Sequence, residues 1–500
     1  MFCTIVGQAC LFVGSRGTRI AAALVIHGPS LQYISTRGQA PHLSFEDVLL
    51  TGLARDGGLY LPETWPQFTH EKIAALAGKP FHEVAVEVIA PFTGGTISRA
   101  VLTEMARASY ASFGHPAVTP LVQIEPDTWI LELFHGPTLA FKDVAMQLLA
   151  RMMDHVLEKR GQRATIVGAT SGDTGGAAIE AFRGSKRVDV VILFPNGRVS
   201  DVQRRMMTTP TEENVHAVAI DGNFDDCQAL VKAMFNDHVF RDRVALSGIN
   251  SINWGRIVAQ ITYYFVAAVA LGAPHRKVSF VVPTGNFGDI FAGYAAKRMG
   301  LPIERLVIAS NSNDILPRTL ETGVYEMRPV VATSSPSMDI GVSSNFERYL
   351  FEASGRDANL IRAQMASLAQ SNRFDLSEQQ MGEFFKTFKA FSCDDDHAAE
   401  FIRHFAQHKG YVADPHTVCG LSAGLSWGAF KDNPTIVLST ASPAKFPDAI
   451  EQITGERPQL PPRLSRLMSN PERFDVLPND LAAVEAYVAA RARSQKVGAA

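Results

Sequence analysis

Cysteine is scarce in this sequence, and a long apolar run is missing altogether. The five cysteines among 500 residues are scattered, odd in number and nowhere paired at the spacing of metal ligands (Cys3, Cys10, Cys227, Cys393 and Cys419). We therefore expect no metal site and a reducing, cytoplasmic environment. The longest apolar stretches, such as residues 261–273, fall short of the roughly 20 residues needed to cross a bilayer, and they contain tyrosines. No membrane span is predicted.

The sequence also lacks an excess of positive charge. Its 47 basic residues oppose 50 acidic ones, the formal net charge is -3, and no basic tract could follow a phosphate backbone. Nucleic acid is therefore not expected as a partner. With 46% hydrophobic and 19% charged residues, the composition is that of a globular protein with a large core. A chain of 500 residues favours two or three domains.

Acidic residues are absent from the first 31 positions, which contain Arg16 and Arg19. Such a composition could belong to a targeting segment, but a signal peptide needs a cleaner apolar run and a clear small-residue cleavage site. We expect residues 1–31 to be a disordered leader or the product of an early start codon. The folded protein is expected to begin at Gln32.

The sequence pattern changes near Gly114. Helical patterns precede this residue, and short β-branched runs that alternate with amphipathic helices follow it. This alternation predicts α/β units, with parallel sheets and helices on both faces. A break at residues 251–256 separates two such units. The predicted strands are 165–170, 189–194, 216–221, 278–283 and 435–440. The expected organisation is a mostly helical N-terminal region at 32–125, a smaller α/β domain at 126–255, a larger α/β domain at 256–460 and a helical C-terminal tail at 461–500.

The first candidate for chemistry is Lys142, in the segment FHGPTLAFKD at the start of a helical pattern. Leu139, Ala140 and Phe141 precede it, and desolvation by such neighbours disfavours the ammonium form of a lysine. The neutral amine is the form that attacks a carbonyl carbon to make a Schiff base. The segment alone leaves an alternative open, because a lysine beside Asp143 is also typical of a surface ion pair.

Two glycine-rich turns, each between a strand and a helix, are the second and third candidates. The first is SGDTGG at residues 171–176 and the second is TGNFGD at residues 284–289. Glycine lets the backbone approach a ligand closely, and the N-terminus of the following helix offers N–H donors to an anion. Each turn is therefore a possible receptor for a carboxylate or a phosphate, although such turns are common in doubly wound sheets.

Neither turn fits the common nucleotide motifs. A dinucleotide site needs the spacing G-x-G-x-x-G and an acidic residue roughly 20 positions later. Neither turn has that spacing, and the strand after the first turn ends in Phe194 and Pro195. A P-loop is also excluded, because G-x-x-x-x-G-K-[ST] does not occur.

Two further segments contain candidates. Thr440, in TIVLSTASPAKF, follows a predicted strand at the edge of the sheet where ligands bind in open α/β folds, and its hydroxyl could equally serve as a turn cap. The segment NSINWGRI (250–257) places Asn253 and Arg256 before a long apolar helix. Arg256 could bind a phosphate with two parallel hydrogen bonds, or it could form an interface salt bridge.

Taken together, these motifs resemble those of the long-chain threonine synthases, which belong to the tryptophan-synthase-β fold group (fold type II) of pyridoxal phosphate enzymes. The resemblance covers nearly everything after residue 31, with the motifs in the family's order. They are YISTRG (33–38), DGGLYLPE (56–63), HGPTLAFKD (135–143), TSGDTG (170–175), NSINWGRI (250–257), PTGNFGD (283–289), PSMDIGVSSNFERYLFE (336–352) and STASPAKF (439–446). It implies an α/β fold with two open parallel-sheet domains and the cofactor in the cleft between them.

The resemblance also implies roles for individual residues. Lys142 would form the Schiff base with pyridoxal 5'-phosphate and move protons at the substrate carbons. Asp173 would lie near the ring hydroxyl of the cofactor, and Thr440 would face its pyridine nitrogen. The cofactor phosphate would bind to the turn formed by Gly285, Asn286, Phe287, Gly288 and Asp289. The substrate would meet Thr170, Ser171, Gly172, Thr174, Asn253 and Arg256.

The implied reaction converts O-phospho-L-homoserine and water to L-threonine and phosphate, in a cytoplasmic monomer or homodimer. Two alternatives stay open at this point. A phospholyase would act on the same substrate and release 2-oxobutanoate, ammonia and phosphate, whereas a non-catalytic binding relative would be expected to lack the lysine that is present here as Lys142. One departure from the family pattern is Ser442, where the family often has histidine.

Overall fold

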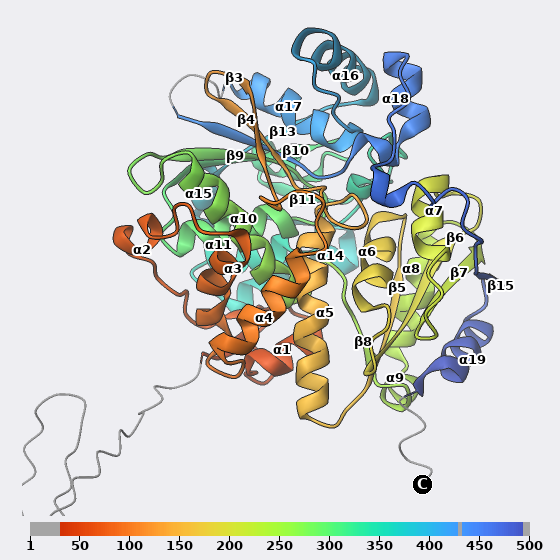
Figure 1. Ribbon diagram of the computed structural model, residues 1–500. Coiled ribbons are helices and arrows are strands. Elements are labelled where there is room, and N and C mark those ends of the chain that lie inside the picture. Colours follow the sequence, from red (N-terminus) through yellow and green to blue (C-terminus); the bar gives the residue numbers. More distant parts are fainter. Residues whose placement is uncertain (1–30, 429–432, 494–500) are drawn as a thin grey trace, which may run out of the picture.

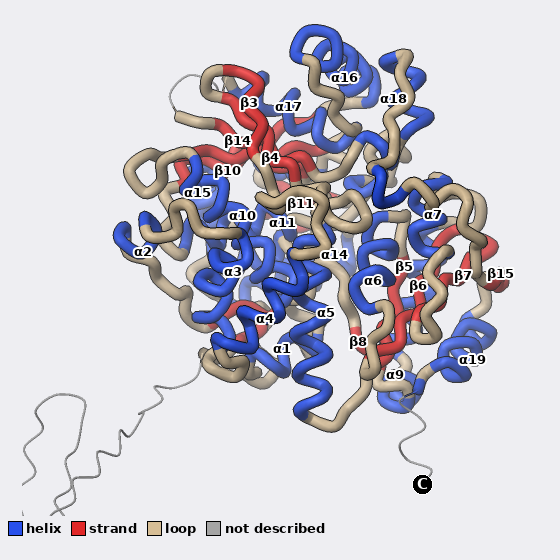
Figure 2. The backbone as a smooth tube through the Cα atoms, viewed as in Figure 1, coloured by secondary structure: helices blue, strands red, loops and turns tan. Residues whose placement is uncertain are grey.

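The fold contains two α/β units side by side, with a mostly helical N-terminal region packed against one of them (Figure 1). The structure is a computed structural model that describes residues 31–428 and 433–493. The expected leader at residues 1–31 therefore lies almost entirely outside the described residues. Figure 2 shows the strands as two separate groups, with helices around both.

The larger sheet has six strands in the order β13-β10-β9-β14-β4-β3. Its strands run parallel to one another except β3, which pairs antiparallel with β4. The bounds are β3 Leu121–Glu125, β4 Thr128–Glu132, β9 Val278–Pro283, β10 Ile303–Ser310, β13 Phe388–Ser392 and β14 Thr435–Ser439. Every residue of β9 and β14 is buried, as expected of parallel strands that are covered on both faces.

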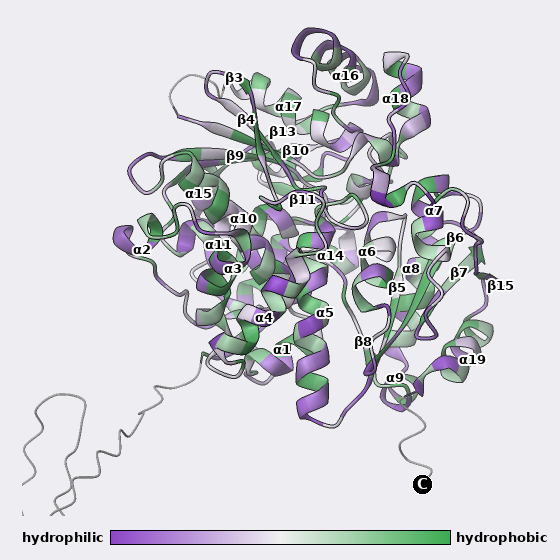
Figure 3. Ribbon diagram, viewed as in Figure 1, coloured by the Kyte–Doolittle hydropathy of each residue, from purple (hydrophilic) through white to green (hydrophobic). Residues whose placement is uncertain are grey.

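The smaller sheet has five parallel strands in the order β15-β7-β6-β5-β8. The bounds are β5 Ala164–Ala169, β6 Val188–Pro195, β7 Val215–Asp221, β8 Leu246–Ser247 and β15 Asp475–Pro478. All five strands predicted from the sequence are present within one residue at each end, as β5, β6, β7, β9 and β14. In Figure 3 the inner strands of this sheet are mostly green, whereas purple gathers on outer helices such as α16.

The expected domain boundaries need two corrections. Strand β4 pairs with β14 and β3 pairs with β4, so residues 121–132 belong to the larger sheet, and not to the N-terminal region and the smaller domain that were expected at 32–125 and 126–255. The C-terminal tail is not purely helical, because β15 pairs with β7 and extends the smaller sheet. Both differences arise from pairing between segments far apart in the chain, which local patterns do not encode.

The N-terminal region contains a two-stranded antiparallel sheet and four α-helices. The bounds are β1 Tyr33–Ser35, α1 Phe45–Thr51, β2 Tyr60–Pro62, α2 His70–Ala74, α3 Phe81–Ile89, η1 Ala90–Thr93 and α4 Arg99–Tyr110. At the start of α1 the Ser44 hydroxyl accepts a hydrogen bond from the backbone N–H of Asp47. Such a cap satisfies one of the free donors of the first turn.

The remaining helices cover the two sheets. Those that follow β4 or lie around the smaller sheet are α5 Lys142–Lys159, α6 Asp173–Phe182, α7 Asp201–Thr208, α8 Phe224–Asn236, α9 His238–Arg243 and α19 Leu481–Arg491. Those of the larger unit are α10 Trp254–Ala270, α11 Gly288–Arg298, α12 Ile315–Thr322, α13 Phe346–Ala353, α14 Ala358–Ser371, α15 Glu378–Thr387, α16 Asp395–Lys409, α17 Pro415–Trp427 and α18 Pro447–Thr454. Short elements complete the chain: β11 Val324–Glu326, η2 Pro336–Met338, β12 Arg373–Asp375, η3 Pro443–Lys445 and η4 Pro462–Leu464.

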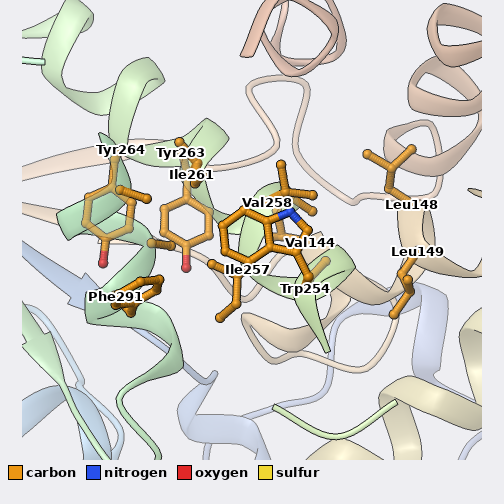
Figure 4. Close-up of a cluster of buried hydrophobic side chains, with 14 of the residues drawn as sticks. Val144, Leu148, Leu149, Trp254, Ile257, Val258, Ile261, Tyr263, Tyr264 and Phe291 are labelled. Carbon is orange, nitrogen blue, oxygen red and sulfur yellow. The ribbon is translucent and has the colours of Figure 1, made fainter. Parts of the chain in front are cut away.

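Helix α10 is the central element of the main hydrophobic core. It packs against α3, α5 and α11, and nearly all of its side chains are buried, which explains why it is apolar on every side. Figure 4 shows Trp254, Ile257 and Val258 of this helix beside Val144 of α5 and Phe291 of α11. Because α5, α10 and α11 share one core, their N-termini are held in fixed positions relative to one another. Over the described residues, no helix is both long and apolar enough to cross a membrane.

Candidate active site

A cavity of 1260 Å³ lies between the two sheets. Its walls include the segments that follow β5, β9 and β14, so it lies at the carboxyl ends of strands from both sheets. Ligands in open α/β folds bind at such edges. The volume exceeds the roughly 300–1,000 Å³ of a pocket for one small molecule, and it therefore has room for a cofactor and a substrate together.

Several helices begin at this cavity. The first turns of α5, α6, α10 and α11 contribute Lys142, Asp173, Arg256 and Gly288 to its walls. The N-terminus of a helix presents unpaired N–H groups and a partial positive charge. Four such ends around one cavity favour anionic groups inside it.

Lys142 lies at the start of α5, and its side chain is 9% exposed. Its Nζ is 3.3 Å from Asp173 Oδ2 and 3.4 Å from Ser337 Oγ. Burial lowers the pKa of this amine, and the carboxylate of Asp173 only partly offsets the effect. The surface ion pair with Asp143 is not formed, because Asp143 is itself buried and accepts hydrogen bonds from the backbone N–H and hydroxyl of Thr138.

Asp173 is the first residue of α6 and is fully surrounded by polar partners. One carboxylate oxygen, Oδ1, is 2.6 Å from Lys445 Nζ and accepts a hydrogen bond of 2.9 Å from Gln203 Nε2. The other oxygen, Oδ2, lies 3.3 Å from both Lys142 Nζ and Ser337 Oγ. Burial alone would raise the pKa of this carboxyl, but the cations of Lys445 and Lys142 hold the pKa well below its usual range.

The turn before α11 has the geometry of a phosphate site. Phe287, the residue before the helix, is in the left-handed region with φ 61°, and its side chain makes no capping hydrogen bond. Within the described chain, the backbone N–H groups of residues 285–288 have no protein acceptor. A Cβ at Gly285 would lie 2.8 Å from the carbonyl oxygen of Ser337, so this position requires glycine. The turn therefore fits the phosphate of the expected cofactor, as the amine of Lys142 fits its aldehyde.

Asp289, in the same turn, has a different environment from Asp173. Its Oδ1 accepts hydrogen bonds of 2.5 Å from Tyr263 and 2.9 Å from Tyr264, whose hydroxyls point in the same direction in Figure 4. Its Oδ2 has no partner in the described part of the protein. Burial raises the pKa of this carboxyl to about 6, because the two tyrosines only partly offset the cost of burying the charge.

Thr440 lines the cavity directly after β14. The segment around it lies against the segment that leads into Lys142. Three backbone hydrogen bonds join the two: Leu133 N–H to Ser439 O, Phe141 N–H to Thr440 O, and Ser442 N–H to Leu139 O. These bonds fix the position of Lys142 relative to Thr440. The Ser442 hydroxyl accepts from the N–H of Ala444 and so acts as a cap of η3.

Some of the predicted residues of the SGDTG turn line the cavity, and others make hydrogen bonds within the turn itself. Ser171 and Thr174 line the cavity, and so does Thr170. The Thr170 hydroxyl accepts hydrogen bonds from the N–H groups of Gly172 and Gly175, which shapes the turn. Gly172 has φ 141°, and a Cβ there would lie 2.5 Å from the Gln203 side chain, so glycine is required for Gln203 to reach Asp173.

Arg256 and Asn253, both predicted as substrate ligands, have different surroundings. The guanidinium of Arg256 is buried at the cavity wall, its Nε has no partner among the described residues, and Nη1 makes one long hydrogen bond of 3.4 Å to Ile249 O. Burial lowers the pKa of Arg256 to about 10. Asn253 is not brought to the cavity wall: its side chain caps α10 at Gly255 N–H and donates to Leu49 O.

The sequence interpretation did not single out several residues of the site. Lys445, Gln203 and Ser337 surround Asp173, and His416 supports Ser337 by accepting the N–H of that residue at Nε2, 3.2 Å away. The other ring nitrogen of His416 lies 2.8 Å from Asp414. Lys445 and Ser337 are part of the motifs STASPAKF and PSMDIG, which is the signal that could have identified them.

A buried lysine at a helix start, beside a carboxylate and opposite a helix N-terminus that can hold a phosphate, defines a class of protein, the pyridoxal phosphate-dependent enzymes of fold type II. Residues 113–440 match the family described as Pyridoxal-phosphate dependent enzyme. Pyridoxal phosphate is therefore the cofactor. Two further matches are more specific: residues 32–110 match Threonine synthase N terminus, and residues 417–488 match Threonine synthase, C-terminal.

Curated and solved relatives agree with these matches. The chain is 51% identical over 459 residues to the threonine synthase of Pseudomonas aeruginosa, covering 92% of this chain and 98% of that protein. It is similar to the crystal structure of pyridoxal phosphate-bound threonine synthase from Brucella melitensis, with 59% identity, a TM-score of 0.90, and coverage of 93% and 100%. The threonine synthase from yeast has 38% identity, a TM-score of 0.87, and coverage of 92% and 99%. The chain belongs to the threonine synthase family, whose members are lyases that act on carbon–oxygen bonds.

Proposed function

We propose that this protein converts O-phospho-L-homoserine and water to L-threonine and phosphate. The observation that carries the proposal is the combination found in one cavity: a buried amine and two separate receptors for anions. The N-terminus of α11 can hold the cofactor phosphate, and the incompletely paired guanidinium of Arg256 can hold a second one. A buried cation without partners is costly, so Arg256 is poised for an anionic ligand.

The residues of the cavity have distinct proposed roles towards the cofactor. Lys142 attaches it, and the turn from Gly285 through Asn286, Phe287 and Gly288 to Asp289 holds its phosphate, with Asp289 kept by the tyrosines away from direct contact. Asp173 lies near the ring hydroxyl, and the neutral hydroxyl of Thr440 faces the ring nitrogen. When bound, pyridoxal phosphate supplies an electron sink for negative charge at the α- and β-carbons of the substrate.

The substrate is proposed to bind between α6 and α10. The hydroxyls of Ser171 and Thr174, together with the first turn of α6, receive the α-carboxylate, while Thr170 and Gly172 hold the shape of that turn. Arg256 receives the phosphate, and Asn253 positions Arg256 by capping α10. In the reaction the bond between the γ-carbon and the phosphate oxygen breaks and phosphate leaves, a C–H bond of the β-carbon breaks and is replaced by a bond to the oxygen of water, and a proton ends on the γ-carbon. Lys142, 9% exposed at the cavity wall, is the base that moves these protons.

The proposal is tested by supplying the purified protein, loaded with pyridoxal phosphate, with O-phospho-L-homoserine. Equal amounts of threonine and phosphate are expected. Release of 2-oxobutanoate and ammonia in place of threonine would instead indicate the phospholyase reaction, and the absence of any phosphate release would refute both. Homoserine without phosphate is the matched control, because it keeps the amino acid and removes the group that Arg256 is proposed to bind.

We further propose a cytoplasmic location and a monomeric or homodimeric state. The three described cysteines, Cys227, Cys393 and Cys419, are all free and buried, which agrees with a reducing compartment. Light scattering on the purified protein distinguishes a mass of 54.4 kDa for the monomer from twice that value for the dimer. A larger assembly would contradict the proposed state.

A further inference from the structure

Asp173 is shared by two buried lysines, and only one of them reaches the cavity. Lys142 lines the cavity, whereas Lys445 is absent from its walls as far as the described residues define them, and its side chain is 1% exposed. The established role of a lysine in this family accounts for Lys142. It leaves open why a second amine is buried at the same carboxylate.

The two contacts with Asp173 differ in length. Lys445 Nζ forms an ion pair with Oδ1 at 2.6 Å, which is closer than the roughly 2.7–2.9 Å usual between an ammonium nitrogen and a carboxylate oxygen. Lys142 Nζ lies 3.3 Å from Oδ2, which is longer than such bonds usually are. Lys445 is therefore the tight counter-ion of Asp173, and Lys142 is a loose one.

The position of Lys445 is set by the same contacts that set Lys142. Its Nζ also donates a hydrogen bond of 2.8 Å to Thr138 O, in the loop that leads into Lys142. The loop and the STASPAKF segment are joined through the isolated bridge between Ala140 and Ala441. Leu139 of this loop has φ 59°, an uncommon conformation for a branched residue, which persists only where the surroundings enforce it.

We propose that Lys445 is a positioning residue: it is the permanent cation of Asp173, and it keeps that carboxylate from holding Lys142 as an ammonium ion. A buried carboxylate needs one cation close by, and Lys445 satisfies this need. The pair of Asp173 and Lys445 then has no net charge, so Lys142 is free to be the neutral amine that attaches the cofactor. The inference rests on the proposed function of Lys142.

The other charged groups near Lys142 do not replace Lys445. Arg256 from α10 also disfavours the ammonium form of Lys142, but it does not pair with Asp173. The Oδ1 oxygen of Asp289, in α11, accepts hydrogen bonds from both Tyr263 and Tyr264. His416 from α17 acts on Asp173 only at longer range. Within this set Lys445 is the one cation in direct contact with the carboxylate, apart from Lys142 itself.

The test uses cofactor-free protein and pyridoxal phosphate, with no substrate. Attachment consumes a neutral amine and an aldehyde and releases water, so its rate as a function of pH reports the protonation of Lys142, and the visible absorption of the product gives the readout. In Lys445→Met, Asp173 has Lys142 as its remaining lysine, and the midpoint of the pH dependence is expected to rise by about one unit or more. Lys445→Arg, which keeps the cation, is expected to stay near the wild type.

Two further variants keep the test decisive if Lys445→Met fails to fold. The double variant Asp173→Asn/Lys445→Met has neither charge, and its midpoint is expected to fall back to that of the wild type or below. Asp173→Asn alone leaves a cation near Lys142, and its midpoint is expected below the wild type. Lys297→Met is the matched control for loss of a partly buried lysine away from the cavity, where Nζ donates to backbone carbonyls, and it is expected to leave the midpoint unchanged.

An unchanged midpoint in Lys445→Met, or the same rise in the double variant, would overturn the inference and make Lys445 a structural link to Thr138. Because no substrate is used, this failure is separate from failure of the proposed function. If the protein makes threonine but the midpoint of cofactor attachment does not change in Lys445→Met, the proposed function stands and the proposed role of Lys445 is refuted.

Discussion

Two aspartates lie at the start of helices in two similar turns, yet the pKa values of their carboxyls are shifted in opposite directions. Asp173, in the SGDTG turn, is the first residue of α6, and Asp289, the last residue of the GNFGD turn, lies in the first turn of α11. Both are buried. Lysines hold the pKa of Asp173 well below its ordinary value, whereas burial raises the pKa of Asp289 to about 6 with no cation in contact among the described residues.

The difference shows how one local motif serves two purposes. A carboxylate beside a bound phosphate weakens its binding, since like charges at short range repel. At Asp289 the conflict is reduced, because two tyrosine hydroxyls donate to its Oδ1 and its raised pKa makes the neutral form easier to reach. Asp173 faces an amine, and there a negative charge stabilises the arrangement. The partners contributed by distant segments therefore decide the chemistry of each turn.

The largest expected effect comes from removing the amine itself. Lys142→Ala should lower threonine formation by about 10³-fold or more, because both the attachment of the cofactor and the proton transfers depend on it. The wild-type protein should be yellow, and borohydride should fix the cofactor on Lys142. Mass spectrometry of the reduced peptide and a threonine assay are the two measurements. If Lys142→Ala still forms threonine, Lys142 is not the catalytic amine, and the contrast between the turns of Asp173 and Asp289 has no bearing on catalysis.

Loss of the anion at the first turn should mainly reduce stability. In Asp173→Asn the buried ammonium of Lys445 loses its counter-ion, and the free energy of unfolding of the cofactor-free protein should fall by about 3 kcal/mol at neutral pH. Urea unfolding monitors this change. The double variant Asp173→Asn/Lys445→Met should recover part of the loss, because the unpaired cation is gone. No recovery would show that the two residues do not act as a pair.

At the second turn the expected effect depends on pH. The folded-state pKa of Asp289, about 6, lies above the unfolded value near 3.9, so protonation favours the folded state and its contribution is lost as the pH rises through about 6. Relative to that of Asp289→Asn, the free energy of unfolding of the wild type should fall by on the order of 3 kcal/mol between pH 4 and pH 7. The difference in free energy of unfolding between the wild type and Asp173→Asn should not change from pH 5 to pH 7. The pKa of Asp173 is lowered in the folded state, so this carboxyl affects the pH dependence of stability only below about pH 4. Equal slopes for both variants would show that the two carboxyls are alike.

A smaller effect is expected from the glycines of the two turns. A Cβ at Gly285 would meet the carbonyl oxygen of Ser337 at 2.8 Å, so Gly285→Ala should displace residues 336–338 and weaken cofactor binding by about tenfold. Gly176→Ala is the matched control in the other turn, since its Cβ would make an ordinary contact at 3.6 Å with Met206. It should bind the cofactor as the wild type does, and it should gain up to about 1 kcal/mol from a better helix former. Cofactor titration and thermal unfolding give the two values.

Local patterns were sufficient to predict five buried strands but not the neighbours of these strands in the sheets. The β-branched runs identified β5, β6, β7, β9 and β14, because a strand buried on both faces needs such residues. Strand β15 was missed, since its residues are mostly exposed and give no apolar pattern. The membership of β4 in the larger sheet could not be predicted, because it depends on pairing with β14, some 300 residues later.

The site follows the same rule. Lys142 and the two turns stand in short motifs, so the sequence located them, and the structure brings them to one cavity. The partners of Asp173 come from α7, η2 and η3, far from Asp173 in the chain. Asn253 was expected at the substrate, but its amide is consumed by the cap of α10. Which polar group is free and which is used internally depends on tertiary packing, and no spacing in the sequence reports it.

The chain passes between the two sheets three times, and each passage carries part of the site. The connection from β4 ends at Lys142, the one from β8 leads to Arg256, and the one from β14 to β15 begins with Thr440 and contains Lys445. Any rotation of one sheet against the other must bend these same segments. A rotation of this kind would therefore move the segments that carry the amine, the guanidinium and Lys445, so that a change in the cleft and a change in the reactive groups are linked through the same stretches of chain.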